Sequence, residues 1–243
     1  IANVAIAVTV VGYASAFFDV TLSPVGTCLA TIATLWICTS LNFRGPKITG
    51  YLSNFSAWGA ILPVAGLSLF GWFWFSPTLY VESWNPNNVP FFSALSNSIS
   101  MTLWAFLGLE SACANSEAVD NPEKNVPKAV LGATIGVAVI YILSTNICAG
   151  IVDNASLVQS TAPFGLVFAS MFNDTVGKIV IGMMVISCAG SLLSWQFTIA
   201  QVFKSLSDAK FFPSAFSKLT KDDAPVVGMV IITCTQTLLS FMT

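Results

Sequence analysis

A carboxylate lies inside one of the most apolar stretches of this sequence, at Glu110 in WAFLGLESACANSEAVDNPEKNVPKA. No charged residue precedes it from Val89 onward. A charge at membrane depth costs about 2.5–3.5 kcal/mol on insertion scales, so it is normally kept only where it faces protein or a water-filled cavity. Glu110 could therefore bind a cation or a proton. The alternatives are a protonated packing residue that bonds to a neighbouring helix, or a position near the inner membrane interface.

The residues around Glu110 favour a cation site over plain packing. Gly108 and Ser111 flank the carboxylate, and a glycine is an inexpensive place to unwind a helix. An unwound turn frees backbone carbonyls, which in transporters often coordinate the substrate or a coupling ion. We therefore interpret residues 104–111 as a broken helix that binds a cation.

Two tryptophans and one asparagine extend the candidate site. Trp104 and Trp195 lie well inside apolar segments, and the face of a tryptophan can hold an ammonium group with about 2 kcal/mol when desolvated. Packing is the alternative for each ring. Asn3, in IANVAIA, could bind a substrate amine or bond to a neighbouring helix.

The composition assigns the chain to the membrane. Of its 243 residues, 55% are hydrophobic and 8% are charged, and the mean hydropathy is +0.80. Soluble domains carry about 25% charged residues. The net charge of -2 argues against a nucleic-acid partner.

Enzyme chemistry, metals and cofactors are not predicted. The chain has no histidine, and its six cysteines lie in apolar runs without a C-x-x-C pair. It also has no carboxylate pair inside an apolar segment and no G-x-S-x-G motif.

About 20 apolar residues span a bilayer as a helix. The sequence predicts seven such segments, at roughly 1–18, 24–42, 53–74, 91–119, 127–152, 177–205 and 225–243. Both ends of the chain fall within apolar runs, so we expect a fragment of a longer protein.

The basic residues predict the orientation, because cytoplasmic loops are rich in Lys and Arg. If the segments alternate in direction, one side receives Arg44, Lys47, Lys124, Lys128, Lys204, Lys210, Lys218 and Lys221. Only Lys178 falls on the other side. The first side is therefore predicted to be cytoplasmic, and Glu82, Asp153 and Asp174 are predicted to face outward.

Several stretches, among them TLWAFLGLESACAN, STAPFGLVFASMF and SWQFTIAQVFKSLSD, resemble the amino acid–polyamine–organocation superfamily, in particular its basic amino acid and polyamine antiporters. The resemblance covers essentially the whole chain. It implies an all-α polytopic membrane fold with twelve helices, built on two inverted repeats of five helices. Residues 1–243 would then form one transporter-domain fragment, equivalent to helices three to nine.

The resemblance also implies roles for the residues around the break. Trp104 matches a tryptophan that stacks over the substrate. The backbone carbonyls of Trp104 and Leu107 match those that receive the α-ammonium beside Gly108. Glu110, followed by Ser111, matches a glutamate implicated in transport and proton sensing.

Two further roles follow from the same resemblance. Trp195 matches a tryptophan that lines the pocket, and Asn3 matches an asparagine near the distal amine or guanidinium group. The resemblance is strongest to antiporters that exchange putrescine for ornithine in the bacterial inner membrane. The expected partners are these two substrates, protons and the lipid bilayer, and a homo-oligomer is left open.

Two alternatives remain at this stage. The same scaffold could exchange arginine for agmatine or lysine for cadaverine, since these pairs differ only in pocket length and distal donors. A more distant alternative is a membrane amino-acid sensor that does not transport.

Overall fold

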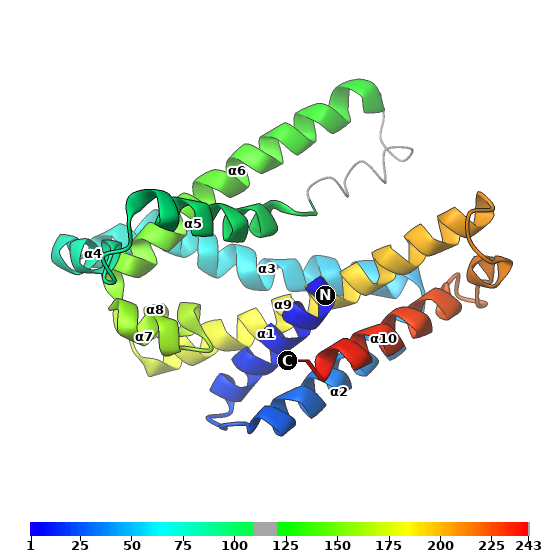
Figure 1. Cartoon of the computed structure of the whole chain (residues 1–243), viewed down its shortest axis with the longest axis horizontal. Coiled ribbons are helices and arrows are strands. Elements are labelled where there is room, and N and C mark those ends of the chain that lie inside the picture. Colours follow the sequence, from blue (N-terminus) through cyan, green and yellow to red (C-terminus); the bar gives the residue numbers. More distant parts are fainter. Residues whose placement is uncertain (109–120, 243) are drawn as a thin grey trace. The chain divides into compact units, whose positions relative to one another are not determined.

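A computed structural model describes residues 1–108 and 121–242, and this part of the chain consists of helices and their connections (Figure 1). In chain order the elements are α1 (Ala2–Phe17), α2 (Pro24–Asn42), α3 (Pro46–Phe70), the 3-10 helix η1 (Gly71–Trp74), α4 (Pro77–Trp84), α5 (Phe91–Phe106), α6 (Pro122–Ile151), α7 (Asn154–Gln159), α8 (Pro163–Met171), α9 (Asp174–Asp208), the 3-10 helix η3 (Ser214–Ser217) and α10 (Val226–Ser240). These residues form no strand, which confirms the predicted all-α class.

Four stretches of helix are long and apolar enough to cross a membrane, namely α2, α3 with η1, α6 and α9. The helices α1 and α10 are apolar but shorter. Because a membrane-spanning helix needs about 20 apolar residues, the chain is a multi-pass membrane protein.

The helices lie on the predicted segments, with shifts at their ends. The segment predicted at 24–42 is α2, and the one predicted at 177–205 lies inside the longer α9. The helix α6 begins at Pro122 rather than near residue 127, because a proline fits the first turn of a helix. Of the segment predicted at 91–119, α5 covers residues up to Phe106, and residues 109–120 lie outside the described part.

A short helix, α4, forms in SPTLYVESWNPNNVP, between the segments predicted at 53–74 and 91–119. Ser76 Oγ accepts a hydrogen bond from the Leu79 backbone N–H at 3.4 Å, and Pro77 occupies the first turn of α4. A serine cap followed by proline is a helix start signal. The turn-forming residues that follow this start signal made the whole stretch resemble a connection without a helix.

The chain forms two compact units, and unit 1 comprises Ile1–Pro63 and Gln159–Thr243. Within unit 1, α9 packs against α1, α2, α8 and α10 (Figure 1). Small residues allow α9 to approach its neighbours closely, including the part of α3 that belongs to unit 1. A Cβ atom on Gly190 would lie 2.4 Å from Ser56 Cβ, and one on Gly177 would lie 2.8 Å from Ala169 Cβ. The long helix α9 is therefore the centre of unit 1.

The helices α1 and α9 run antiparallel. Ala7 shares a buried cluster with Leu192, whereas a Cβ on Gly182 would lie 3.1 Å from the Phe17 ring. Residues later in α1 therefore contact residues earlier in α9.

Unit 2, Val64–Val158, is organised around the C-terminal half of α6. The Ser76 backbone N–H donates to the Gly150 carbonyl at 2.8 Å, and Tyr80 Oη donates to Asn146 Oδ1 at 2.5 Å. A Cβ on Gly150 would lie 2.2 Å from the Phe75 ring. These contacts hold α4 and the turn before it against α6.

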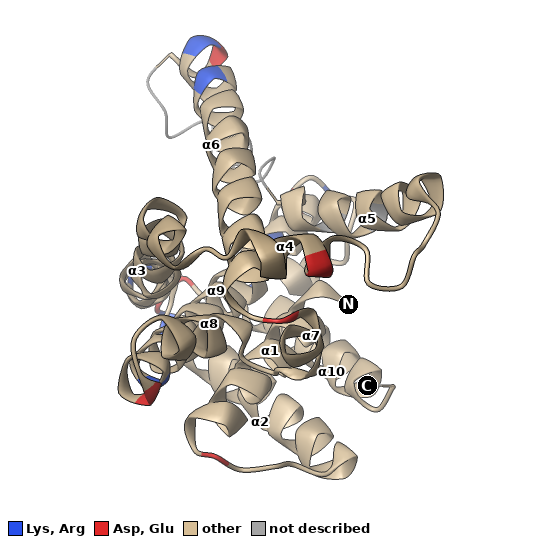
Figure 2. Ribbon diagram, turned by 90° about the vertical axis from the view of Figure 1, so that its left-hand side faces the viewer, with Lys and Arg blue, Asp and Glu red and all other residues tan. Residues whose placement is uncertain are grey.

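Charged residues concentrate at helix ends and in connections, while the long central parts of the helices carry none (Figure 2). In α9, for example, no charged residue lies between Lys178 and Lys204. This distribution suits a bilayer, because a charge in hydrocarbon is costly.

Candidate functional site

The predicted site residues fall into three groups. Glu110 and Ser111 lie outside the described residues, as does the side chain of Trp104. The backbone of Trp104, with Leu107 and Gly108, belongs to unit 2. The other two predicted residues, Asn3 and Trp195, belong to unit 1, so each unit is described separately.

The helix that carries Trp104 ends just before the predicted break. The last residue of α5 is Phe106, Leu107 is 69% exposed, and Gly108 has φ 103°. That left-handed backbone favours glycine, because other residues meet a steric penalty there. A helix end leaves its last four carbonyls without an intrahelical donor, so the backbone here can accept hydrogen bonds from outside the helix.

One of these carbonyls already has a partner that the sequence did not indicate. Tyr141 Oη of α6 donates to the Ala105 carbonyl at 3.3 Å, and the Tyr141 and Phe106 rings meet edge to face at 5.5 Å. Tyr141 therefore supports the end of α5 from a neighbouring helix. In the sequence, the one sign of this role is that the polar hydroxyl of Tyr141 lies in an apolar segment.

Asn3 and Trp195 lie on the antiparallel pair α1 and α9. Asn3 is 4% exposed, and its Nδ2 has no hydrogen-bond partner among the described residues. Since Ala7 packs with Leu192, Asn3 lies one turn further along the pair, at the level of residues 195 and 196 of α9. Trp195 is half-buried, in the middle of an unbroken helix.

A row of buried polar side chains in unit 1 was not predicted from the sequence. Gln196 Nε2 donates to Gln236 Oε1 at 3.1 Å, and the hydroxyls of Thr39 and Thr233 lie 2.7 Å apart. Asn42 Nδ2 donates to the Leu193 carbonyl at 2.9 Å. None of these side chains is ionisable, and each lies in an apolar helix without a recognisable motif. The sequence therefore carries no signal that they form a hydrogen-bond network.

The described residues hold no group of three or more side chains suited to a metal ion. In each of the three hydrogen bonds of the row just described, donor and acceptor are amides, hydroxyls or backbone carbonyls. The row therefore joins helices of unit 1 through neutral groups.

One end of unit 1 carries two adjoining cavities. A cavity of about 680 Å³ and another of about 460 Å³ share Asp19 in their walls, and Lys178 lines the smaller one. Lys178 Nζ forms an ion pair with Asp19 Oδ2 at 2.5 Å, with 49% and 70% of the two side chains exposed. This pair ties the connection after α1 to the first turns of α9.

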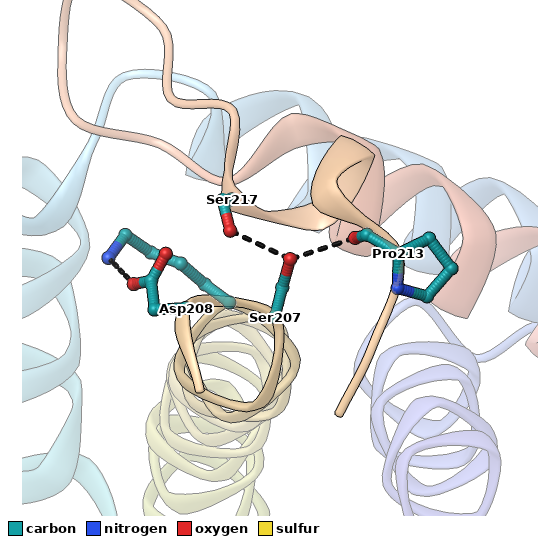
Figure 3. A network of polar contacts seen from close by, with 5 residues as sticks. Ser207, Asp208, Pro213 and Ser217 are labelled. Atoms are coloured by element: carbon teal, nitrogen blue, oxygen red, sulfur yellow. Dashed lines mark hydrogen bonds and ion pairs between the residues drawn. The ribbon is translucent and has the colours of Figure 1, made fainter. Parts of the chain in front are cut away.

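The opposite end of unit 1 is basic and closely packed. Ser207 donates to the Pro213 carbonyl at 2.8 Å and accepts from Ser217 at 2.7 Å, while Lys204 and Asp208 pair at 2.6 Å (Figure 3). The ring of Phe203 of α9 meets those of Phe212 and Phe216 in the following connection in tilted contacts, and the latter two meet edge to face.

The connection after α2 meets this basic end. Gly45 has φ 85°, and a Cβ on it would lie 1.9 Å from the Asp222 carbonyl oxygen. Two of the predicted basic connections, the one with Arg44 and Lys47 and the one that runs from Lys204 to Lys221, are therefore at the same end of unit 1.

The carboxylate of Asp153 lies outside the spanning segments and has a lowered pKa. The Asp153 carboxylate accepts from the Ser156 backbone N–H at 2.8 Å, and this bond holds the pKa of Asp153 below its ordinary value. Asp153 caps the start of α7, in the connection that follows α6.

Comparison with known proteins identifies the family of this chain. A family model described as amino acid permease matches residues 1–243. The chain belongs to this family. A protein of Haemophilus influenzae named putrescine transporter PotE is 64% identical over 243 residues, which are 100% of this chain and 56% of that protein.

Two relatives from Escherichia coli bear on the subtype. The putrescine transporter PotE of strain K12 is 63% identical over 100% of this chain and 55% of its own length. A cadaverine/lysine antiporter of the same strain is 28% identical over 242 residues, 54% of its length. The chain thus spans about half the length of the curated relatives it matches.

Proposed function

We propose that this permease is a secondary antiporter that exchanges ornithine for putrescine. The observation that carries the proposal is the 64% identity to a putrescine transporter over all 243 residues. The 28% identity to a cadaverine/lysine antiporter makes lysine–cadaverine exchange the second candidate. Alternating access would proceed without covalent chemistry, so the proposed role is transport and not catalysis.

The proposed site receives a cation at the end of α5. The carbonyls at this helix end and the turn at Leu107 and Gly108 would accept from an ammonium group, supported by the positive φ of Gly108. Glu110 and Ser111 would supply a carboxylate and a hydroxyl next to it. The ring of Trp104 would stack over the aliphatic chain and the ammonium group.

Two residues of unit 1, on α1 and α9, are proposed as further substrate-binding residues. Trp195 would add a second aromatic face, and Asn3 would contribute its amide near the distal amine. The buried position of Asn3 supports such a role, in which the carbonyl oxygen of its amide would accept from the amine. The chain would contribute helices three to nine of a twelve-helix inverted-repeat fold.

The proposed location is a bacterial inner membrane, with the basic end of unit 1 in the cytoplasm. The meeting of Gly45 with Asp222 supports this, since it places two basic connections at one end. The ion pair of Asp19 with Lys178 would then face outward. Proton-coupled putrescine uptake through Glu110 is proposed as a second mode, and a homo-oligomer stays open.

Counterflow in proteoliposomes tests the exchange. Vesicles that contain the full-length protein and are preloaded with putrescine should accumulate labelled ornithine, and take up labelled lysine, arginine and agmatine much more slowly. If lysine is taken up against internal cadaverine as fast as ornithine is taken up against internal putrescine, lysine–cadaverine exchange becomes the better assignment. A pH gradient imposed without internal putrescine should drive putrescine uptake if the second mode exists.

Two substitutions test the site in the same vesicles. Trp104→Leu should abolish exchange, and Trp104→Phe should retain part of it because an aromatic face remains. Trp58→Leu is the matched control, since Trp58 of α3 is 56% exposed. Glu110→Gln should reduce putrescine exchange at least about tenfold, which corresponds to 1.4 kcal/mol of binding. Normal exchange in Trp104→Leu and Glu110→Gln would remove both residues from the site.

A further inference from the structure

The amide of Gln196 attaches α9 to two neighbouring helices at once. Its Nε2 donates to Gln236 Oε1 of α10 at 3.1 Å and to the Leu35 carbonyl of α2 at 3.4 Å. Gln196 is 2% exposed. Since both amide protons are used in a buried position, any rotation of α9 that breaks these bonds leaves buried polar groups unpaired, which is costly.

A second buried amide reaches α9 less than one turn away. Asn42 of α2 is 0% exposed, and its Nδ2 donates to the Leu193 carbonyl at 2.9 Å. Its Oδ1 accepts from Thr49 Oγ1 at 2.8 Å, so the Asn42 side chain is held at both ends. The Asn42 side chain is therefore fixed in the orientation in which it donates to α9.

These two contacts enclose the segment that carries Trp195. The carbonyl of Leu193 precedes Trp195 by two residues, and Gln196 follows it directly. Consecutive side chains on a helix diverge by about 100°, so the direction of Gln196 fixes the direction of Trp195. The helices that supply the partners are joined to each other independently, through the hydroxyls of Thr39 and Thr233 at 2.7 Å.

We propose that Asn42 and Gln196 are positioning residues for Trp195, which set the rotation of α9 and thereby the direction of the indole ring. The inference rests on the proposed function, in which Trp195 lines the substrate pocket.

A double-mutant cycle in the full-length protein tests the positioning role. Gln196→Leu should raise the KM for putrescine about tenfold, equivalent to 1.4 kcal/mol, with a smaller change in maximal rate. In a Trp195→Leu background the same substitution should change the KM less than about twofold, because residues that act through one another are not additive. Independent, multiplying effects of the two substitutions would overturn the proposal.

Matched variants separate positioning from general destabilisation. Thr39→Val removes a buried hydrogen bond between the same helices α2 and α10 and should leave the KM unchanged. If Gln196→Leu does not accumulate in the membrane, Gln236→Met removes one partner and leaves the bond to Leu35 in place. Gln236→Met should then raise the KM in the wild-type background and not in the Trp195→Leu background. A KM raised equally by Thr39→Val would show a purely structural role.

A substrate-independent readout keeps this inference apart from the proposed function. In Trp195→Cys, alkylation at position 195 by a thiol reagent can be quantified by peptide mass spectrometry. Adding Asn42→Leu or Gln196→Leu should change that rate at least about threefold, as expected for a reoriented side chain. An unchanged rate overturns the positioning role whatever the protein transports. If the rate changes but the full-length protein with Trp195 intact exchanges no putrescine, the proposed function alone is overturned.

Discussion

The helices α6 and α9 are almost equally apolar but lie in different surroundings. The most apolar window has a mean hydropathy of 1.9 in α6 and 2.0 in α9. Only 6% of that window is buried in α6, compared with 39% in α9. Hydropathy therefore identifies both as membrane helices but does not decide which one becomes the centre of a packed unit.

Small and polar residues account for the difference. A Cβ on Gly132 or Gly136 of α6 would meet no atom of the described residues within 4 Å, whereas one on Gly190 of α9 would lie 2.4 Å from Ser56 Cβ. In lipid, helices associate through close packing and interhelical hydrogen bonds rather than through the hydrophobic effect. The features that attach α9 are glycines at contacts and buried amides.

The largest effect is expected from glycine substitutions. Gly190→Ala forces Cβ into the position of Ser56 and should cost about 1–3 kcal/mol through overpacking. The measurement is the thermal midpoint for loss of monodisperse protein in detergent. Gly136→Ala is the control on α6 and should be neutral or slightly stabilising.

The clash at Gly190 can also be relieved from its partner. Ser56→Gly in the same molecule should restore part of the lost stability, because both near atoms belong to the Ser56 side chain. Equal tolerance of alanine at positions 190 and 136 would erase the contrast between the two helices.

A medium effect is expected where a buried hydrogen bond joins the neighbours of α9. Thr39→Val removes the 2.7 Å contact with Thr233 and should cost about 1 kcal/mol. Thermal denaturation in detergent measures the loss. Tyr141→Phe on α6 removes a bond to Ala105 from an exposed residue and should cost less. A larger loss for Tyr141→Phe would mean that α6 is attached by polar contacts as strongly as α9.

A small effect is expected at the charged start of α9. Asp19→Asn breaks the pair with Lys178, and both side chains are largely solvated. Exposed pairs contribute about 0–1 kcal/mol, and salt screens them. The thermal midpoint should therefore fall by a degree or two at low salt and converge with wild type at high salt. A large loss that persists in high salt would contradict this.

The smallest effect is expected after α6, at the Asp153 cap. Because the Ser156 N–H lowers the pKa of Asp153, the cap contributes fully above the ordinary value of 3.8 and is lost as the pH falls through the lowered pKa. Asp153→Ala should increase deuterium uptake by residues 153–159 near neutral pH, and Asp153→Asn should do so less. Acidification should remove the difference between wild type and Asp153→Ala. A pH-independent difference would show that the carboxylate charge is not responsible.

The end of a helix next to Gly108 could be predicted from the sequence, while the side chains that support this helix end and α9 could not. An apolar stretch that contains glycine and a carboxylate indicates a helix break, and α5 does end just before Gly108. Tyr141, Asn42 and Gln196 were not predicted, because an interhelical hydrogen bond leaves no mark on the spacing of residues within one helix.

Composition and local order alone determined the solvent, the class and the approximate helices of this protein. Apolar runs of sufficient length must form helices in lipid, since each backbone N–H and carbonyl there needs an internal partner. The tertiary structure alone decided that α9 is the centre of unit 1 and that Asn42 and Gln196 hold the segment around Trp195. The physical reason is that a helix satisfies its own backbone, whereas its neighbours are chosen by side chains from segments far apart in the chain.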